Sequence, residues 1–190
     1  MKSVLISIQP KWCELIASGK KTVEVRKTKP KIETPFKCYI YCTKEKRKDD
    51  FITISGAFGL IRCPECAIYN RAKEYDCNGK VIGEFVCDGI EPFTEYELLY
   101  DGHYVEKKTR VPQKELFSYK GKNDFLYGWH ISQLKIYDKP KELYDFANYE
   151  KYQVCKEKDC FSGDCWVCPN NPILIRPPQS WSYVEPLKEN

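Results

Sequence analysis

One short segment of the sequence gathers the charged residue types that bind polar ligands and catalyse reactions. Residues 19–26 read GKKTVEVR, a G-x-K-x-x-E-x-R pattern whose charged positions are Lys21, Glu24 and Arg26. Alternate side chains of a strand lie on one face about 7 Å apart, so we expect Glu24 and Arg26 to share a face. Lys21 precedes the strand, and its long side chain can reach the same place. The pattern is compatible with a ligand site and with a solvent-exposed strand of alternating charge, and periodicity does not decide between them.

Two kinds of chemistry are open to this charged motif. Burial of Lys21 near Arg26 would lower the pKa of its ammonium group, so that the lysine acts as a base or nucleophile while Glu24 holds a water molecule. Alternatively, the three charges neutralise one another and hold a nucleobase or a phosphate group.

Aromatic side chains are spread over several predicted elements. Flat rings near cations stack with nucleobases, although most aromatic residues at alternating strand positions pack in a core. We select Trp12 and Trp129 as candidate walls of a binding site, because Trp12 lies on the helix before the charged motif and Trp129 lies beside His130.

The C-terminal part of the chain contains a cluster of cysteines. Four of them lie within fourteen residues, at Cys155, Cys160, Cys165 and Cys168. Four thiolates satisfy tetrahedral zinc, and the final C-x-x-C is a usable metal-binding turn, although the other two spacings are not those of a common zinc finger. The alternatives are a structural zinc ion and a set of buried free thiols.

The elements that must position these residues are mostly strands. Apolar runs and period-two alternation predict six strands, and prolines open three short helices. The helices are predicted at 10–18, 112–119 and 140–146, and the strands at 3–8, 22–27, 36–42, 80–90, 127–137 and 181–184. Because long helices do not alternate with the strands, we expect an α+β protein with a small curved β-barrel rather than a doubly wound α/β fold.

The composition fits a folded globular protein of one domain. The 190 residues are 42% hydrophobic and 31% charged, which argues against disordered, collagen-like and membrane-spanning chains. Residues 1–50 hold thirteen Lys and Arg against six Asp and Glu, an excess that can attract a polyanion. The N-terminal segment has no signal-peptide pattern, so we expect a cytoplasmic protein, whose eleven cysteines would remain thiols or metal ligands.

The opening segment LISIQPKWCELIASGKKTVEVRK resembles the signature of the ASCH domain, a member of the PUA-like β-barrel superfamily. The segments GKVIGEFVCD, YGWHISQLKIYDKPKEL and RPPQSWSYVE also resemble those of phage and Firmicute ASCH-domain proteins. We therefore expect an ASCH domain at 1–149, a Cys-rich insert at 150–175, and a segment at 176–190 whose strand closes the same domain. The resemblance implies a cleft between the barrel and its short peripheral helices that binds RNA or a nucleotide.

The resemblance also implies a possible hydrolase activity. Small acetylcytidine amidohydrolases of this superfamily use a lysine, a threonine and a glutamate to remove an acyl group from modified cytidine. Lys21 matches the lysine, Glu24 occupies the threonine position, and Glu84 is the best-placed counterpart of the glutamate. Lys21, Glu24 and Glu84 are thus candidate catalytic residues, and the replacement of threonine by Glu24 argues against this activity.

Three functional hypotheses follow. The first is a binding module whose cleft accepts RNA or a modified nucleobase, with Lys21, Glu24 and Arg26 as polar contacts and Trp12 and Trp129 as walls. The second is an enzyme of the same fold, either an amidohydrolase acting on acylated nucleosides or a ribonuclease. The third is a protein-interaction adaptor stabilised by zinc in the Cys-rich insert.

Overall fold

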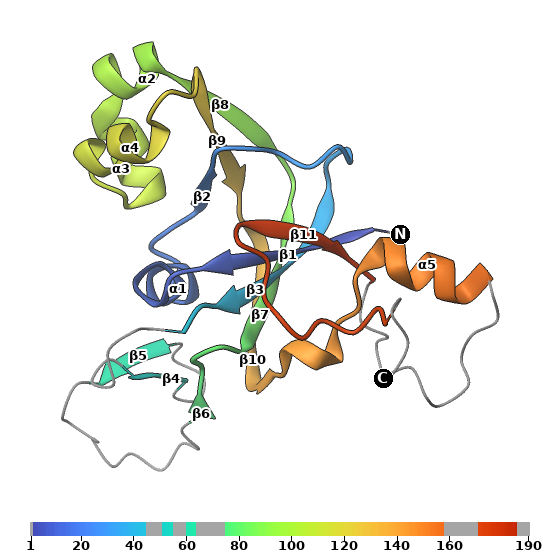
Figure 1. Ribbon diagram of the computed structural model, residues 1–190. Helices are drawn as coiled ribbons and strands as arrows, with labels where there is room; N and C mark the ends of the chain where they lie inside the picture. Colours follow the sequence, from blue (N-terminus) through green and yellow to red (C-terminus); the bar gives the residue numbers. More distant parts are fainter. Residues whose placement is uncertain (1, 45–50, 55–59, 64–74, 158–170, 186–190) are drawn as a thin grey trace.

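The computed structural model describes residues 2–44, 51–54, 60–63, 75–157 and 171–185 (Figure 1). The helices in these ranges are α1 (Pro10–Ala17), α2 (Glu95–Tyr100), α3 (Gly102–Thr109), α4 (Gln113–Lys120), the 3-10 helix η2 (Leu143–Asp145) and α5 (Tyr149–Glu157). The strands are β1 (Ser3–Ile8), β2 (Val23–Arg26), β3 (Phe36–Cys42), β4 (Phe51–Ile54), β5 (Leu60–Cys63), β6 (Tyr75–Asp76), β7 (Val81–Cys87), β8 (Ile90–Thr94), β9 (Phe125–His130), β10 (Ser132–Lys141) and β11 (Trp181–Val184).

The largest sheet has five strands in the order β10-β7-β3-β1-β11. Its central strands β1 and β3 run parallel, and the other pairs are antiparallel. All six residues of β1 are buried, as expected for an apolar strand with neighbours on both sides. Strand β11 pairs with β1, so the C-terminal segment belongs to the same sheet as the N-terminal strand.

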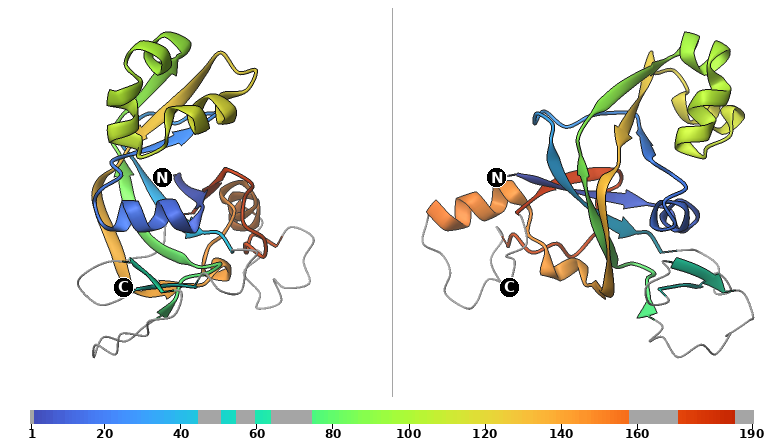
Figure 2. Two further views of the ribbon diagram at one scale, coloured as in Figure 1. Left: turned by 90° about the vertical axis from the view of Figure 1, so that its left-hand side faces the viewer. Right: turned by 180° about the vertical axis from the view of Figure 1, so that it is seen from behind.

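A second sheet, in the order β2-β9-β8, carries a group of three helices. Helices α2, α3 and α4 gather at one end of the molecule beside this sheet in all views (Figures 1 and 2). Their apolar side chains form one buried cluster with those of the strands, made up of Val23, Val25, Phe93, Leu98, Val105, Leu116 and Leu126. This packing uses one face of β2 and leaves the alternate residues of that strand for the opposite face.

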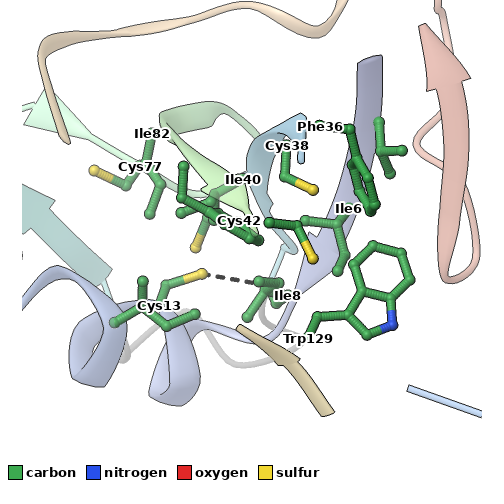
Figure 3. Close-up of a cluster of buried hydrophobic side chains, with 14 residues drawn as sticks. Ile6, Ile8, Cys13, Phe36, Cys38, Ile40, Cys42, Cys77, Ile82 and Trp129 are labelled. Carbon is green, nitrogen blue, oxygen red and sulfur yellow. Dashed lines mark hydrogen bonds between the residues drawn. The ribbon is translucent and has the colours of Figure 1, made fainter. Parts of the chain in front are cut away.

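The main core lies between α1 and the five-stranded sheet (Figure 3). It combines isoleucines with buried thiols, including Cys13, Cys38, Cys42 and Cys87. Burial raises the pKa of the Cys13 and Cys38 thiols well above the usual value. These cysteines are therefore neutral and serve as small apolar side chains of the core.

The predicted strands 3–8, 36–42 and 181–184 are confirmed to the residue, and 22–27 is confirmed as β2. The segment 80–90 divides into β7 and the start of β8, and 127–137 divides into β9 and β10. The helix predicted at 140–146 is wrong in part, because this range holds the end of β10 and only the short helix η2. Helices α2 and α3 lie between the strand predicted at 80–90 and the helix predicted at 112–119, in a segment for which the sequence predicts no helix or strand. Helix α5 lies at the start of the predicted Cys-rich insert.

The prediction of a closed barrel is wrong. Within the described residues, β10 and β11 are the outer strands of the five-stranded sheet and do not pair with each other. Strand β2 pairs with β9 in a separate sheet, whose apolar face packs on helices α2 to α4. The strands thus bury their faces against helices in an open arrangement, and the α+β class is confirmed. No helix in the described ranges has the length and apolar character needed to cross a membrane.

Candidate functional site

Strand β2 places the charged motif on the face opposite to the one that carries Val23 and Val25. Helix α1 ends where Gly19 adopts a left-handed backbone conformation with φ of 70°, which glycine takes without steric cost. The backbone N–H of Lys21 then donates to the carbonyl of Leu15 at 2.9 Å and ties the turn to the helix. Within β2, Val23 and Val25 enter the apolar cluster, so Glu24 lies on the other face.

Lys21, Glu24 and Arg26 meet in one buried group, which we call the charged triad. Glu24 Oε1 lies 2.9 Å from Arg26 Nη2, and Glu24 Oε2 lies 3.3 Å from Lys21 Nζ. The relative exposures are 1% for Lys21, 5% for Glu24 and 7% for Arg26. A solvent-exposed strand of alternating charge is therefore excluded, and the expected convergence of Glu24 and Arg26 is confirmed.

Backbone carbonyls from two other elements hold the cations of the charged triad. Lys21 Nζ donates to the carbonyl of Thr109 at 2.5 Å, at the C-terminal end of α3. A cation is favoured there, because the helix dipole places partial negative charge on its last carbonyls. Arg26 Nη2 donates to the carbonyl of Ser7 in β1 at 2.6 Å. The triad thus connects β1, β2 and α3.

Two polar atoms of the charged triad are buried without a hydrogen-bond partner among the described residues. They are Glu24 Oε2 and Arg26 Nε. Glu24 Oε2 is within ion-pair distance of Lys21 Nζ, but the direction of approach is outside hydrogen-bonding geometry. Buried donors and acceptors are almost always paired in folded proteins. Glu24 Oε2 keeps its ion pair with Lys21, so Arg26 Nε is the polar atom of the triad that has no partner among the described residues.

Burial lowers the pKa of Lys21 below its usual value. The nearby Glu24 opposes this shift by stabilising the charged ammonium group, and Arg26 adds to it by repulsion. Lys21 thus combines two properties of a reactive lysine: it is removed from water, and hydrogen-bonding groups fix its position.

The charged triad lines a cavity of about 750 Å³, which we call the main cavity. Trp12 from α1 and Tyr119 from α4 supply aromatic walls, and Lys21 Nζ lies 5.2 Å from the centroid of the Trp12 ring. The segment before β11 contributes Gln179 and Ser180. The charged residues of the lining comprise four cations and two carboxylates, namely Lys11, Lys21, Arg26, Lys27, Glu24 and Glu115.

Trp129 does not line the main cavity. It is fully buried in the main core, where its ring packs edge-on against Phe36 at a centroid distance of 5.8 Å and lies 6.0 Å from the ring of Trp181. Strand β9 places Trp129 opposite Glu24 in the ladder, but the indole enters the core. The structure therefore assigns Trp129 to packing and corrects its selection as a wall.

Glu84 also lies away from the main cavity. It is on β7, where Tyr137 donates its hydroxyl to Glu84 Oε2 at 2.7 Å and Lys37 Nζ lies 3.3 Å from Glu84 Oε1. Neither Tyr137 nor Lys37 lines the main cavity. The structure thus brings Lys21 and Glu24 together, but it does not add Glu84 to them.

The predicted zinc site lies largely outside the described residues. Cys155 is buried on α5, and the other three cysteines, at 160, 165 and 168, fall in the undescribed range. In the described ranges, no group of three or more His, Cys, Asp or Glu side chains is arranged to hold a metal ion. Structural zinc in the Cys-rich insert stays a prediction.

Sequence reasoning missed three contributors to the site. Tyr119 was placed on a predicted helix without a role, and the carbonyls of Thr109 and Ser7 carry no signal in residue type. A tyrosine at the penultimate position of a short helix has the same residue type as many packing residues. Only the tertiary arrangement, which brings α4 over β2, identifies it as part of the lining.

Comparison with known proteins agrees with this arrangement. A sequence model of the ASCH domain matches residues 6–161. The chain belongs to the ASCH domain family. The phage and Firmicute affinity inferred from the sequence stays a prediction, and comparison with curated proteins gave no match.

Solved structures support the fold of this ASCH domain. A crystal structure of ASCH from Zymomonas mobilis superposes with a TM-score of 0.53 at 16% identity, covering 96% of this chain and 87% of that one. A structure of a single-substitution mutant of the same Zymomonas mobilis protein gives a TM-score of 0.54 at 16% identity, with coverage of 97% and 91%. At this level of identity the similarity establishes the fold alone.

Proposed function

We propose that this ASCH domain binds single-stranded RNA by accepting one nucleobase, or a modified nucleobase, in the main cavity. The observation that carries the proposal is the buried charged triad, in which Glu24 Oε2 accepts and Arg26 Nε donates no hydrogen bond among the described residues, and whose members line the same cavity as Trp12. The edge of a nucleobase offers a donor beside an acceptor, which is the complement of this pair. An aromatic wall for its π face is the other element of base recognition.

The charge of the main cavity supports an anionic or nucleotide ligand. Its lining has two more cations than carboxylates, and Lys27 Nζ lies 5.0 Å from the ring centroid of Tyr119. Cations beside aromatic rings are typical of sites that bind single-stranded nucleic acid through phosphates and stacked bases. Membership of the ASCH family, which belongs to the PUA-like superfamily, is consistent with such a ligand.

Binding is tested with two kinds of probe. Fluorescein-labelled RNA hexamers rA6, rC6, rG6 and rU6 are titrated by anisotropy, and the corresponding nucleosides and N4-acetylcytidine are titrated by calorimetry. Trp12→Leu should weaken the best probe about tenfold, because base stacking on an aromatic ring contributes about 1–3 kcal/mol. Trp12→Phe keeps an aromatic face and should retain most of the affinity.

The control for these titrations is Lys156→Ala, which removes an exposed lysine from α5 outside the main cavity. It should bind every probe as the wild type does. Equal affinity of Trp12→Leu and the wild type, or no binding of any probe by the wild type, would contradict the proposal.

A second candidate function is hydrolysis in the same cavity, favoured by the lowered pKa of Lys21. A neutral lysine amine can act as base or nucleophile toward the acyl group of an acylated nucleoside. Incubation with N4-acetylcytidine, followed by chromatography, would reveal cytidine and acetate. Lys21→Arg keeps the positive charge but should abolish turnover, whereas simple recognition of the base should persist. Cleavage of the RNA hexamers in the same incubations would indicate a ribonuclease instead.

A further inference from the structure

A second hollow of about 420 Å³ adjoins the main cavity on the outer side of helix α3. It is lined by His103, Glu106, Lys107, Arg110, Val111 and Pro112. Val111 also lines the main cavity, so the two hollows share a wall.

The lining of the second hollow is set by the periodicity of α3. His103 and Lys107 are four residues apart, which places them on one face of α3, and Arg110 is the residue at which the helix ends. All three are exposed. Two basic side chains and an imidazole thus line the hollow, against a single carboxylate from Glu106.

Glu106 is engaged with the protein. Its Oε1 accepts a hydrogen bond from the backbone N–H of Gln113, at the start of α4. An acidic side chain is favoured there, because the helix dipole places partial positive charge at the first backbone N–H groups. The carboxylate is thereby held against α4, and Lys107 and Arg110 remain as the exposed charges of the hollow.

Arg110 connects the second hollow to the charged triad. It adopts a left-handed backbone conformation with φ of 57°, which is unfavourable for a residue with a side chain. In this conformation Arg110 Nε donates to the carbonyl of Lys20 at 2.8 Å, next to Lys21. Thr109, the preceding residue, accepts the hydrogen bond of Lys21. Residues 109–111 thus connect the charged triad, through Thr109, to the second hollow, which Arg110 and Val111 line.

We propose that the second hollow binds the phosphate adjacent to the nucleotide whose base occupies the main cavity. The two hollows together then accommodate two consecutive nucleotides of an RNA strand. Guanidinium and ammonium groups are suited to phosphate oxygens, and the wall shared at Val111 places these groups next to the main cavity. This inference rests on the function proposed for the main cavity and extends it from a single base to a strand.

The test compares a probe that reaches both hollows with one that fills only the main cavity. The first is whichever of the rA6, rC6, rG6 and rU6 hexamers binds best, and the second is the nucleoside of the same base. Lys107→Ala should raise the Kd of the hexamer at least threefold and leave that of the nucleoside within twofold of the wild type. The slope of log affinity against log salt concentration should become less negative by about 0.7, the value for one phosphate contact on a single strand.

A reciprocal variant and a matched control make the test specific. Glu106→Gln keeps an oxygen that can accept from Gln113 but removes the negative charge, so it should tighten the hexamer and not the nucleoside. Lys156→Ala removes an exposed lysine from the last turn of α5, as Lys107→Ala does from the last turn of α3. Helix α5 lies on the other side of the molecule from α3 (Figure 1), so this variant should bind both probes normally.

The outcomes separate this inference from the proposed function. If the wild type binds the nucleoside but Lys107→Ala and Glu106→Gln bind the hexamer as Lys156→Ala does, the second hollow has no role and the main cavity alone is the site. The same conclusion follows if the wild type binds the nucleoside and no hexamer. If the wild type binds neither probe, the function proposed for the main cavity is wrong and this inference fails with it.

Discussion

At the scale of single residues, Glu24 determines the charge balance of the main cavity. It is the shared anion of two buried cations, with Arg26 Nη2 at 2.9 Å and Lys21 Nζ at 3.3 Å. Without it, two positive charges would face each other in a part of the protein from which water is excluded. Removing one member of a buried ion pair costs far more than the pair itself contributes to stability.

We therefore predict that Glu24→Gln destabilises the protein by about 3 kcal/mol. Lys21→Met should cost less, about 1–2 kcal/mol, because it leaves Glu24 and Arg26 as a neutral pair and mainly deprives the carbonyl of Thr109 of its donor. Urea unfolding at pH 7 measures both values. A smaller cost for Glu24→Gln than for Lys21→Met would contradict this account of the triad.

The pH dependence of Glu24→Gln provides a second test. Burial lowers the pKa of Lys21 and Glu24 opposes this shift, so the pKa falls further in Glu24→Gln. The unfolded state, with a lysine pKa of about 10.4, then binds more protons than the folded state at pH values between the two pKa values. The free energy of unfolding of Glu24→Gln, measured relative to that of the wild type, should therefore rise as the pH increases from 7 to 9.5. A constant difference over this range would show that Lys21 does not titrate with the triad.

The residues of the charged triad could be identified from sequence, because a strand of known phase fixes which side chains share a face. The sequence could not show that Trp129 belongs to the core, since Trp12 and Trp129 have the same residue type and both were candidates for the site. Their difference arises from tertiary packing: Trp12 lies over Lys21 at the cavity, and Trp129 fills the core against Phe36. Glu84 was a candidate for the site because it is a glutamate, but its position on β7 keeps it away from the main cavity.

At the scale of elements, the site depends on the sheet β2-β9-β8, which holds β2 against the three helices. Gly128 lies at the centre of this sheet, opposite Val25 in β2 and Glu91 in β8. A Cβ atom at this position would lie 2.6 Å from ring atoms of Phe93 and 2.9 Å from a methyl group of Val23. The absence of a side chain therefore permits the close packing that fixes the orientation of β2.

We predict that Gly128→Ala destabilises the protein by about 1–3 kcal/mol, the usual cost of overpacking a core. Because the ring of Phe93 and the methyl group of Val23 both lie in the buried cluster, neither has free space into which to move. Chemical denaturation measures the change. A change below about 0.5 kcal/mol would mean that this sheet does not constrain β2 as described.

The contact between β7 and β10 predicts an alkaline loss of stability. The pKa of Tyr137 is strongly raised, first by burial and then by its hydrogen bond to the carboxylate of Glu84. A tyrosine in the unfolded chain ionises near pH 10, whereas Tyr137 in the folded protein ionises only at higher pH. The contribution of Tyr137 to the free energy of unfolding is therefore fully present below pH 10 and is lost as the pH rises further. Tyr137→Phe should flatten the decline between pH 9.5 and 11. Tyr144→Phe, at an exposed tyrosine, should not.

Element boundaries were predictable where apolar runs end at proline or polar residues, as in β1, β3 and β11. The pairing of the strands could not be predicted, because period-two alternation shows which face of a strand is apolar but not which strand pairs with it. This explains why six predicted strands did not form the expected closed barrel. Helices α2 and α3 are short and begin after Thr94 and Asp101, and Thr94 accepts from the backbone of Glu97 in a capping box. The spacing of Thr94 and Glu97 is therefore a helix-start signal that the sequence contains.

At the scale of the whole molecule, the asymmetry of charge along the chain converges on one cavity. All four cations of the main cavity, Lys11, Lys21, Arg26 and Lys27, come from the first fifty residues. That part of the chain holds thirteen of the thirty-one Lys and Arg residues. We therefore predict that a polyanion binds at the face on which the charged triad lies, with an affinity that falls as the salt concentration rises.

The central claim is that a nucleobase occupies the main cavity beside Trp12. The most direct test is a ¹⁵N–¹H NMR titration of the tryptophan indole signals with the best-binding nucleoside, with Trp12 and Trp129 assigned from Phe variants. We predict that the Trp12 signal shifts in proportion to saturation while that of Trp129, fully buried in the core, stays in place. Saturable binding that leaves the Trp12 signal unmoved would contradict the account.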